Sequence, residues 1–156
     1  MMYSTHAPTS PRGFTLLIAV VMVSVLVSVG LALLDITYKQ VLLAQAATQS
    51  QYAFYNADSA LECALYWDQK QNAFSYSYTT PTAITCGNLS VPSTLTNGTT
   101  KQTVLTIPCA AGGSSATVTV LKTASAVTTI YANGYNLCNT SDPKRIERGL
   151  RAQYGS

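Results

Sequence analysis

The sequence predicts an α+β fold in which a long N-terminal helix packs on a small antiparallel sheet of about four strands. The helix is indicated by an uncharged apolar segment from Phe14 to Leu34 and by the absence of proline from Phe14 to about Gln71. The sheet is indicated by segments rich in β-branched residues that turn residues separate in the second half of the chain. We therefore expect four parts: residues 1–13, a membrane-spanning helix over 14–34, an amphipathic continuation over 35–73, and a globular β domain over 74–156.

The apolar segment is long enough to cross a bilayer, because as a helix it spans about 32 Å. A secretion signal has a shorter apolar core of roughly 7–15 residues and a small-residue cleavage site after that core. Here the small residue, Gly13, precedes the apolar segment, and no comparable site follows Leu34. An ordinary cleaved signal peptide is therefore disfavoured.

Beyond the apolar segment, apolar residues recur mostly three and four positions apart, from Leu42 to Leu65, which predicts an amphipathic helix. Asp35 and Lys39 lie four residues apart, and we expect them to pair on the helix surface. We interpret the aromatic residues of this part as side chains that pack in the core and around its edge; they are Tyr52, Tyr55, Tyr66 and Trp67.

Residues 74–100 are rich in turn formers, with Pro81, Pro92 and Asn97-Gly98, and read as a loop with room for one short strand. The predicted strands are 103–109, 115–122, 127–135 and 145–154. In the last of these, Leu150, Ala152 and Tyr154 fall on one side, which is the alternation of a half-buried strand.

Four cysteines follow the apolar segment, at Cys63, Cys86, Cys109 and Cys138. Their spacing matches no zinc finger or zinc ribbon, and an even number in a translocated domain favours disulfides. Four cysteines allow three pairings, and we favour Cys63 with Cys86 and Cys109 with Cys138, which close the shortest loops.

The composition argues against an enzyme. Charged residues make up 10% of the chain and the net charge is +3, so strong nucleic-acid affinity of the whole chain is not expected. The single histidine, His6, precedes the apolar segment, and no glycine-rich phosphate loop occurs. We expect no catalytic residues, no metal and no cofactor.

The segment RGFTLL, at the start of an apolar span that continues as an amphipathic helix and ends in a small β domain, resembles type IV pilins and type II secretion pseudopilins. The resemblance implies that a prepilin peptidase cleaves between Gly13 and Phe14 and that Phe14 becomes N-methylated. Residues 1–13 would be a cytoplasmic leader, and the C-terminal domain would lie outside the cytoplasmic membrane. The implied partners are the membrane, prepilin peptidase, other pilin subunits and the assembly machinery, and the final location is a cell-surface filament.

One position departs from the family pattern. Most members carry a glutamate at the fifth mature position, which in this sequence is Ile18. Members without the acid resemble the K-type tip pseudopilin, and the segments FYNADSALECAL and YANGYN with RIERGLRAQY are similar to the X-type minor pilin. The resemblance therefore implies a minor pilin at the tip or in the filament.

Asp58 and Glu62 are like charges four residues apart on the predicted helix. One interpretation is an intersubunit or strand-to-helix bridge to an arginine of the C-terminal segment, and the other is solvent exposure; the arginines are Arg145, Arg148 and Arg151. Two other functions stay open. One is an uncleaved membrane-anchored adhesin or sensor. The other is a DNA-binding tip subunit that uses Lys144 and these arginines, although such charges more often protect an edge strand.

Overall fold

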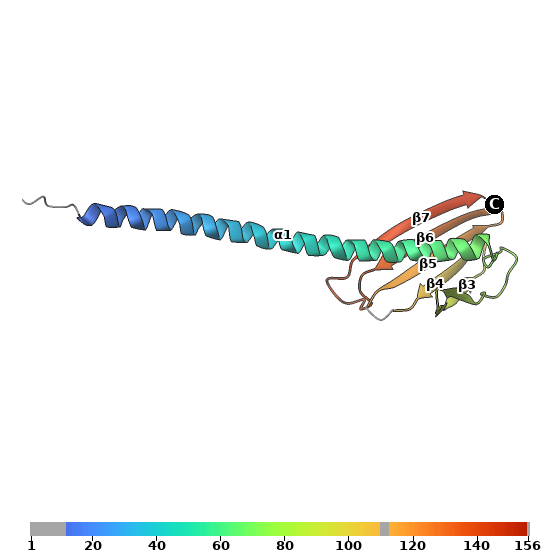
Figure 1. The fold of residues 1–156 in the computed structure, drawn as a ribbon. Coiled ribbons are helices and arrows are strands. Elements are labelled where there is room, and N and C mark those ends of the chain that lie inside the picture. The colour runs from blue at the N-terminus through green and yellow to red at the C-terminus, as the bar shows by residue number, and fades with distance from the viewer. Residues whose placement is uncertain (1–11, 110–112, 156) are drawn as a thin grey trace, which may run out of the picture. The chain divides into compact units, whose positions relative to one another are not determined.

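The computed structural model describes residues 12–109 and 113–155, so most of the expected leader, with His6, lies outside the described residues. The chain divides into two compact units, Met1–Ala44 and Gln45–Ser156. The secondary structure begins with one helix, α1, which spans Arg12–Gln69. The prediction of a single helix through both the apolar and the amphipathic parts is confirmed (Figure 1).

The helix α1 ends where Asn72 adopts a left-handed backbone conformation, with a φ of 50°. Asparagine is one of the few residues that tolerate this conformation. The turn lets the Ala73 N–H donate to the Trp67 carbonyl at 2.9 Å, which satisfies one of the carbonyls left open at the helix end.

The second unit contains a five-stranded antiparallel sheet in the order β3-β4-β5-β6-β7, with each strand beside its neighbour in the sequence. The strands are β3 Ser93–Thr96, β4 Thr100–Ile107, β5 Ser115–Thr123, β6 Val127–Tyr135 and β7 Glu147–Gly155. A separate two-stranded sheet pairs β1 Ile84–Cys86 with β2 Leu89–Val91.

The predicted α+β class, with one long helix packed on an antiparallel sheet, is confirmed. The prediction of at most one strand in residues 74–100 is wrong, because β1, β2 and β3 all lie in that segment. These strands have only three or four residues each. Such a length is too short for alternation to stand out among turn-forming residues. The four longer strands were all predicted, and β6 matches the predicted range of 127–135.

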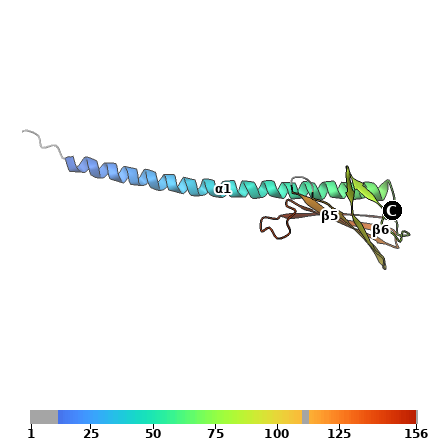
Figure 2. The same cartoon turned by 90° about the horizontal axis from the view of Figure 1, so that it is seen from below.

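The last part of α1 lies across one face of the sheet (Figures 1 and 2). Its buried apolar side chains are the small ones of Ala53, Ala57, Ala60 and Ala64. An alanine stripe lets the helix backbone approach the sheet closely, and α1 comes very close to the sheet at Gly134 of β6. A Cβ atom at Gly134 would lie 2.2 Å from the Ala53 carbonyl oxygen, so only glycine fits there.

The core lies between this stripe and the inner face of the sheet. Larger apolar side chains fill the space on either side of the alanines, and they are Phe74, Ile84, Val91, Leu105, Val118, Val120 and Ile130. Trp67 packs at the edge of this core, and its indole N–H donates to the Thr85 carbonyl at 2.8 Å. The core interpretation is confirmed for Trp67 and is wrong for Tyr52, Tyr55 and Tyr66, which are more than half exposed on the outward side of α1.

Two disulfides close the domain, and their pairing is the predicted one. Cys63–Cys86 ties α1 to β1. Cys109–Cys138 ties the segment after β4 to the segment after β6. The disulfides close loops of 23 and 29 residues, which restricts the unfolded chain more than shorter loops would.

A buried polar cluster joins the end of α1 to the sheet. The Asp68 carboxylate lies 2.7 Å from the Lys122 ammonium of β5 and accepts a 2.6 Å hydrogen bond from the Tyr154 hydroxyl of β7. The Asp68 side chain is 3% exposed. Burial, together with the neighbouring carboxylate, raises the pKa of the Tyr154 phenol well above its ordinary value, so this group stays protonated and keeps donating.

Candidate functional site: the uncovered apolar helix

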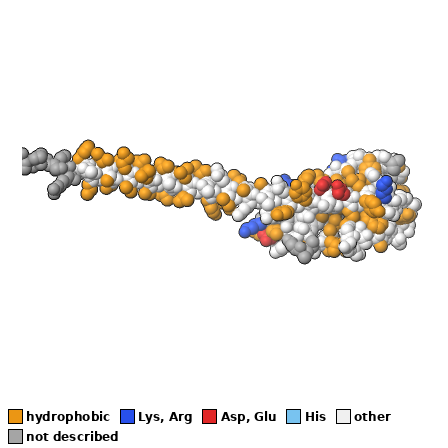
Figure 3. Space-filling view, in the orientation of Figure 1, with side chains coloured by type: hydrophobic (Ala, Val, Ile, Leu, Met, Phe, Trp, Pro, Cys, Tyr) orange, Lys and Arg blue, Asp and Glu red, His pale blue; other side chains and the backbone are white. Residues whose placement is uncertain are grey.

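The described residues of the first unit, from Phe14 to Ala44, expose their side chains all around α1. Phe14 is 65% exposed and Leu43 is 71% exposed. Figure 3 shows apolar side chains along the visible face of this part of the helix. Helices that are apolar on every side are stable only when another apolar phase surrounds them.

Three hydroxyl groups of this part of α1 are satisfied within the helix. Ser24, Ser28 and Thr37 donate to backbone carbonyls three or four residues earlier, at 2.7 to 2.8 Å. Because these groups need no water, they add little to the free energy of transfer into an apolar surrounding. By length and composition, this part of α1 can cross a membrane.

One side of the apolar helix carries small residues among its valine and leucine side chains. A shallow open groove runs along it between Leu16 and Leu31, with Ala19, Ser24 and Ser28 among its lining residues. Small residues at such spacing let a second helix approach closely, because packing between helices in lipid depends on close van der Waals contact. The apolar helix is therefore suited to packing against another helix as well as to lipid.

The predicted processing residues lie at the start of α1. Gly13 and Phe14 are in its first helical residues, and Ile18 lies one turn after Phe14. The Ile18 side chain is apolar and 42% exposed, so it can contact lipid or another helix. The expected Asp35–Lys39 pair is confirmed, with 2.8 Å between the carboxylate and the ammonium.

The predicted bridge between the helix acids and the C-terminal arginines is not formed within the chain. In residues 12–109 and 113–155, the ion pairs are Asp35–Lys39 and Asp68–Lys122. Glu62 is exposed, and Asp58 is half-buried. The strand-to-helix version of that interpretation is therefore wrong, and an intersubunit role of these charges stays a prediction.

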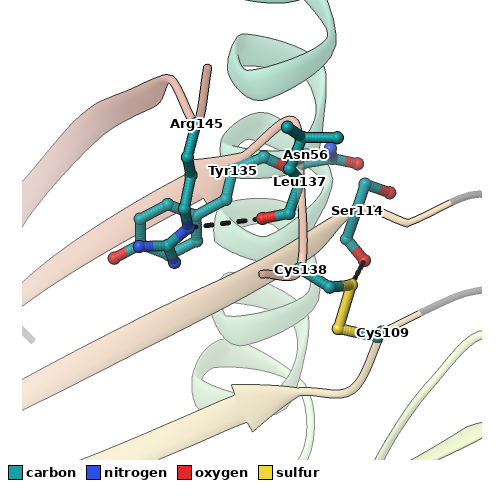
Figure 4. The surroundings of a disulfide bond; sticks show 7 residues. All are labelled: Asn56, Cys109, Ser114, Tyr135, Leu137, Cys138 and Arg145. Carbon is teal, nitrogen blue, oxygen red and sulfur yellow. Dashed lines mark hydrogen bonds between the residues drawn. A yellow bond between two sulfur atoms is a disulfide. The ribbon is translucent and has the colours of Figure 1, made fainter. Parts of the chain in front are cut away.

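Each arginine has another partner. The Arg145 guanidinium lies 3.6 Å from the centre of the Tyr135 ring and donates to the Leu137 carbonyl, next to the Cys109–Cys138 disulfide (Figure 4). Arg148 donates to the Ser50 hydroxyl of α1 at 2.7 Å. Arg151 donates to Gln153.

The cluster of Asp68, Lys122 and Tyr154 was missed by the sequence reasoning. A signal was present, because Lys122 alternates with Val118 and Val120 and so falls on the apolar side of a strand. A cation at such a position requires a buried anion. The cluster connects helix and sheet rather than forming a reactive site, and the described residues contain no group of three metal-ligating side chains.

The sequence matches no family model, and neither the comparison with curated proteins nor that with solved structures finds a match.

Proposed function

We propose that this chain is a minor pilin-like structural subunit of a type IV pilus or a related filament. A prepilin peptidase would remove residues 1–13 by cleaving between Gly13 and Phe14. The apolar part of α1 would hold the subunit in the cytoplasmic membrane before assembly, with the β domain outside. After extraction, the same residues would pack among the helices of other subunits.

The observation that carries this proposal is the contrast between the two units. The second unit encloses a core and has two disulfides, whereas the residues from Phe14 to Ala44 are exposed on every side. A helix that is long, apolar and uncovered suits both lipid and a bundle of similar helices. The small residues Ala19, Ser24 and Ser28 along one side of the helix support packing in such a bundle.

Ile18 supports a minor rather than a major subunit. A charged side chain within an apolar span raises the insertion free energy, by up to about 2.5–3.5 kcal/mol at the helix centre, so subunits that retain an acid at this position must gain from it during assembly. This chain has no acid at that position. Its docking would then rely on apolar packing alone, which suits a subunit that enters the filament first or in few copies.

The test is the intact mass and N-terminal peptide sequence of the protein from the membrane and the sheared-surface fractions of its own cells. We expect a chain that begins with N-methylated Phe14 and occurs in sheared filaments in small amount. In a Gly13→Val variant, we expect the full-length chain to accumulate in the membrane. Gly30→Val is the matched control, because the same substitution then lies inside the apolar helix where no other group is within 4 Å.

Retention of residues 1–13 in the wild-type protein, with no protein in the sheared fraction, would refute the proposal. That result would leave a membrane-anchored surface domain. Equal processing of the Gly13→Val variant and the wild type would refute the assigned cleavage site.

A further inference from the structure

Two asparagines of the second unit are followed directly by glycine, and the structure places them in contrasting surroundings. Asn97-Gly98 lies in the turn between β3 and β4, where both residues are exposed. Asn133-Gly134 lies within β6, which has β5 on one side and β7 on the other, and Gly134 is buried. The same dipeptide therefore occurs once in an open turn and once inside the sheet.

An asparagine before a glycine can form a cyclic imide with little steric hindrance, because glycine has no Cβ to shield its backbone nitrogen. That nitrogen attacks the carbonyl carbon of the asparagine side chain and loses its proton to solvent. The side-chain nitrogen takes up a proton and leaves as ammonia, which completes a five-membered succinimide ring. Water then opens the ring at one of its two carbonyls, so the product is aspartate or isoaspartate. Water is the only co-reactant.

The turn leaves Asn97 open to this reaction. The Gly98 carbonyl accepts a 3.5 Å hydrogen bond from the Tyr76 hydroxyl. Within the described part of the chain, neither the Asn97 side chain nor the Gly98 N–H has a hydrogen-bond partner. The exposed side chain can therefore rotate until its carbonyl carbon meets the Gly98 nitrogen.

The sheet holds Asn133-Gly134 in a conformation that cannot cyclise. Gly134 is paired with Ala116 of β5 and with Arg148 of β7, so its N–H is directed at a neighbouring strand and is engaged in the ladder. Gly134 also lies against the backbone of α1, where a Cβ atom would come within 2.2 Å of the Ala53 carbonyl oxygen. Ring closure here would require β6 to leave both neighbours and the helix.

We propose that Asn97 is a site of spontaneous deamidation in the folded domain, and that Asn133 is protected by the fold. The product has a carboxylate in place of the amide, so the turn gains a negative charge as the chain ages. Isoaspartate also adds one carbon atom to the backbone of the turn. The altered turn adjoins β3, an edge strand of four residues, so the change stays at the edge of the sheet. The inference does not rest on the proposed function, because it concerns the domain whether or not the chain enters a filament.

The fold does not require glycine at position 98. Gly98 is not among the glycines with a positive φ, and a Cβ atom there would meet only the Thr100 carbonyl oxygen, at an ordinary contact distance of 3.6 Å. Gly98→Ala should therefore keep the turn, while the added methyl group shields the attacking nitrogen. This variant separates the chemistry of the turn from its folding.

The test is incubation of the full chain, folded in detergent micelles with both disulfides intact, in a mildly alkaline buffer. Proteolysis and mass spectrometry then follow the two asparagine peptides, because exchange of ammonia for water raises the peptide mass by about one dalton. We expect the Asn97 peptide to convert at least tenfold faster than the Asn133 peptide. In the reduced chain unfolded in urea, the two should convert within about threefold of each other, since both dipeptides are then solvated. Gly98→Ala should slow conversion at Asn97 at least tenfold and leave the melting temperature unchanged.

Equal conversion of the two peptides in the folded chain would overturn the proposal. Absence of conversion at Asn97 in the folded chain, when the unfolded chain converts at both sites, would also overturn it, because the turn would then be protected. Unchanged conversion in Gly98→Ala would exclude attack by this nitrogen. The comparison of the two peptides within the wild-type chain decides the question even if the variant fails to fold.

Discussion

Replacement of Gly134 by alanine tests the close contact between α1 and the sheet. The added Cβ would lie 2.2 Å from the Ala53 carbonyl oxygen and 2.3 Å from the Ala57 amide nitrogen. Ordinary contact begins at 3.4 Å, so one element must retreat by about 1.2 Å (3.4 − 2.2). Both neighbours are helix backbone atoms, which move only if the helix moves.

A shift of this size would separate the alanine stripe from the inner face of the sheet. A gap of about 0.5–1 Å already removes a quarter to a half of each contact energy. Overpacking usually lowers the free energy of unfolding by about 1–3 kcal/mol, and we expect about 3 kcal/mol or more here because no side chain can rotate away. For a domain of this size the melting temperature should fall by about 10–20 °C.

The assay is thermal and denaturant unfolding of the full chain in detergent micelles, followed by near-ultraviolet circular dichroism of the tyrosines and Trp67. Gly149→Ala is the matched control, since it lies on neighbouring β7 and its Cβ would meet only the Asn133 side-chain oxygen at 3.0 Å. That oxygen can move with its side chain, so we expect a change within about 1 kcal/mol. Equal destabilisation by the two variants would refute the close-contact reasoning.

The remaining predictions concern the polar groups and the disulfides of the same domain. Asp68→Asn should lower the free energy of unfolding by about 3 kcal/mol, because it leaves Lys122 buried without a counter-charge; an additional Lys122→Met should restore most of the loss in urea unfolding. The raised pKa of Tyr154 means that its contribution is complete below about pH 10 and declines as the pH rises further, so the melting temperature of Tyr154→Phe should fall less steeply above that pH than that of the wild type. Thr128→Val should stabilise by about 1–2 kcal/mol in the same assay, because the fully buried Thr128 hydroxyl has no hydrogen-bond partner among residues 12–109 and 113–155; a loss of stability would mean that the hydroxyl is satisfied. Removal of either disulfide by a double Cys→Ser change should lower stability by about 3–4 kcal/mol for loops of 23 and 29 residues, and a change below about 1 kcal/mol would contradict the loop-entropy reasoning.

The long elements were predictable from the sequence because each repeats a local signal many times. The absence of proline over more than fifty residues predicted α1, and β-branched residues between turn signals predicted β6 with its correct bounds. The side of α1 that faces the sheet was harder to predict from the sequence. Alanine is only weakly apolar, so the apolar residues that recur between Leu42 and Leu65 did not reveal that the buried stripe is Ala53, Ala57, Ala60 and Ala64.

The polar contacts could not be predicted, because each joins residues from segments that lie far apart in the sequence. Asp68, Lys122 and Tyr154 come from three elements that are separated by up to 86 residues. Arg145 packs on Tyr135 only because the segment between β6 and β7 folds back beside the disulfide. The exposed tyrosines of α1 were misjudged for a similar reason, since helical spacing alone does not reveal which side the sheet covers.

The disulfides have a mechanical consequence. When a chain is pulled from its ends, a segment closed by a disulfide cannot lengthen even after its hydrogen bonds have broken. The two closed loops contain 23 and 29 residue steps, which correspond to about 80 Å and about 100 Å of extended chain. The oxidised domain can therefore stretch about 180 Å less than the reduced one. Under a pulling force, the hydrogen bonds of the sheet would break first, and the disulfides would then carry the force past the two closed loops.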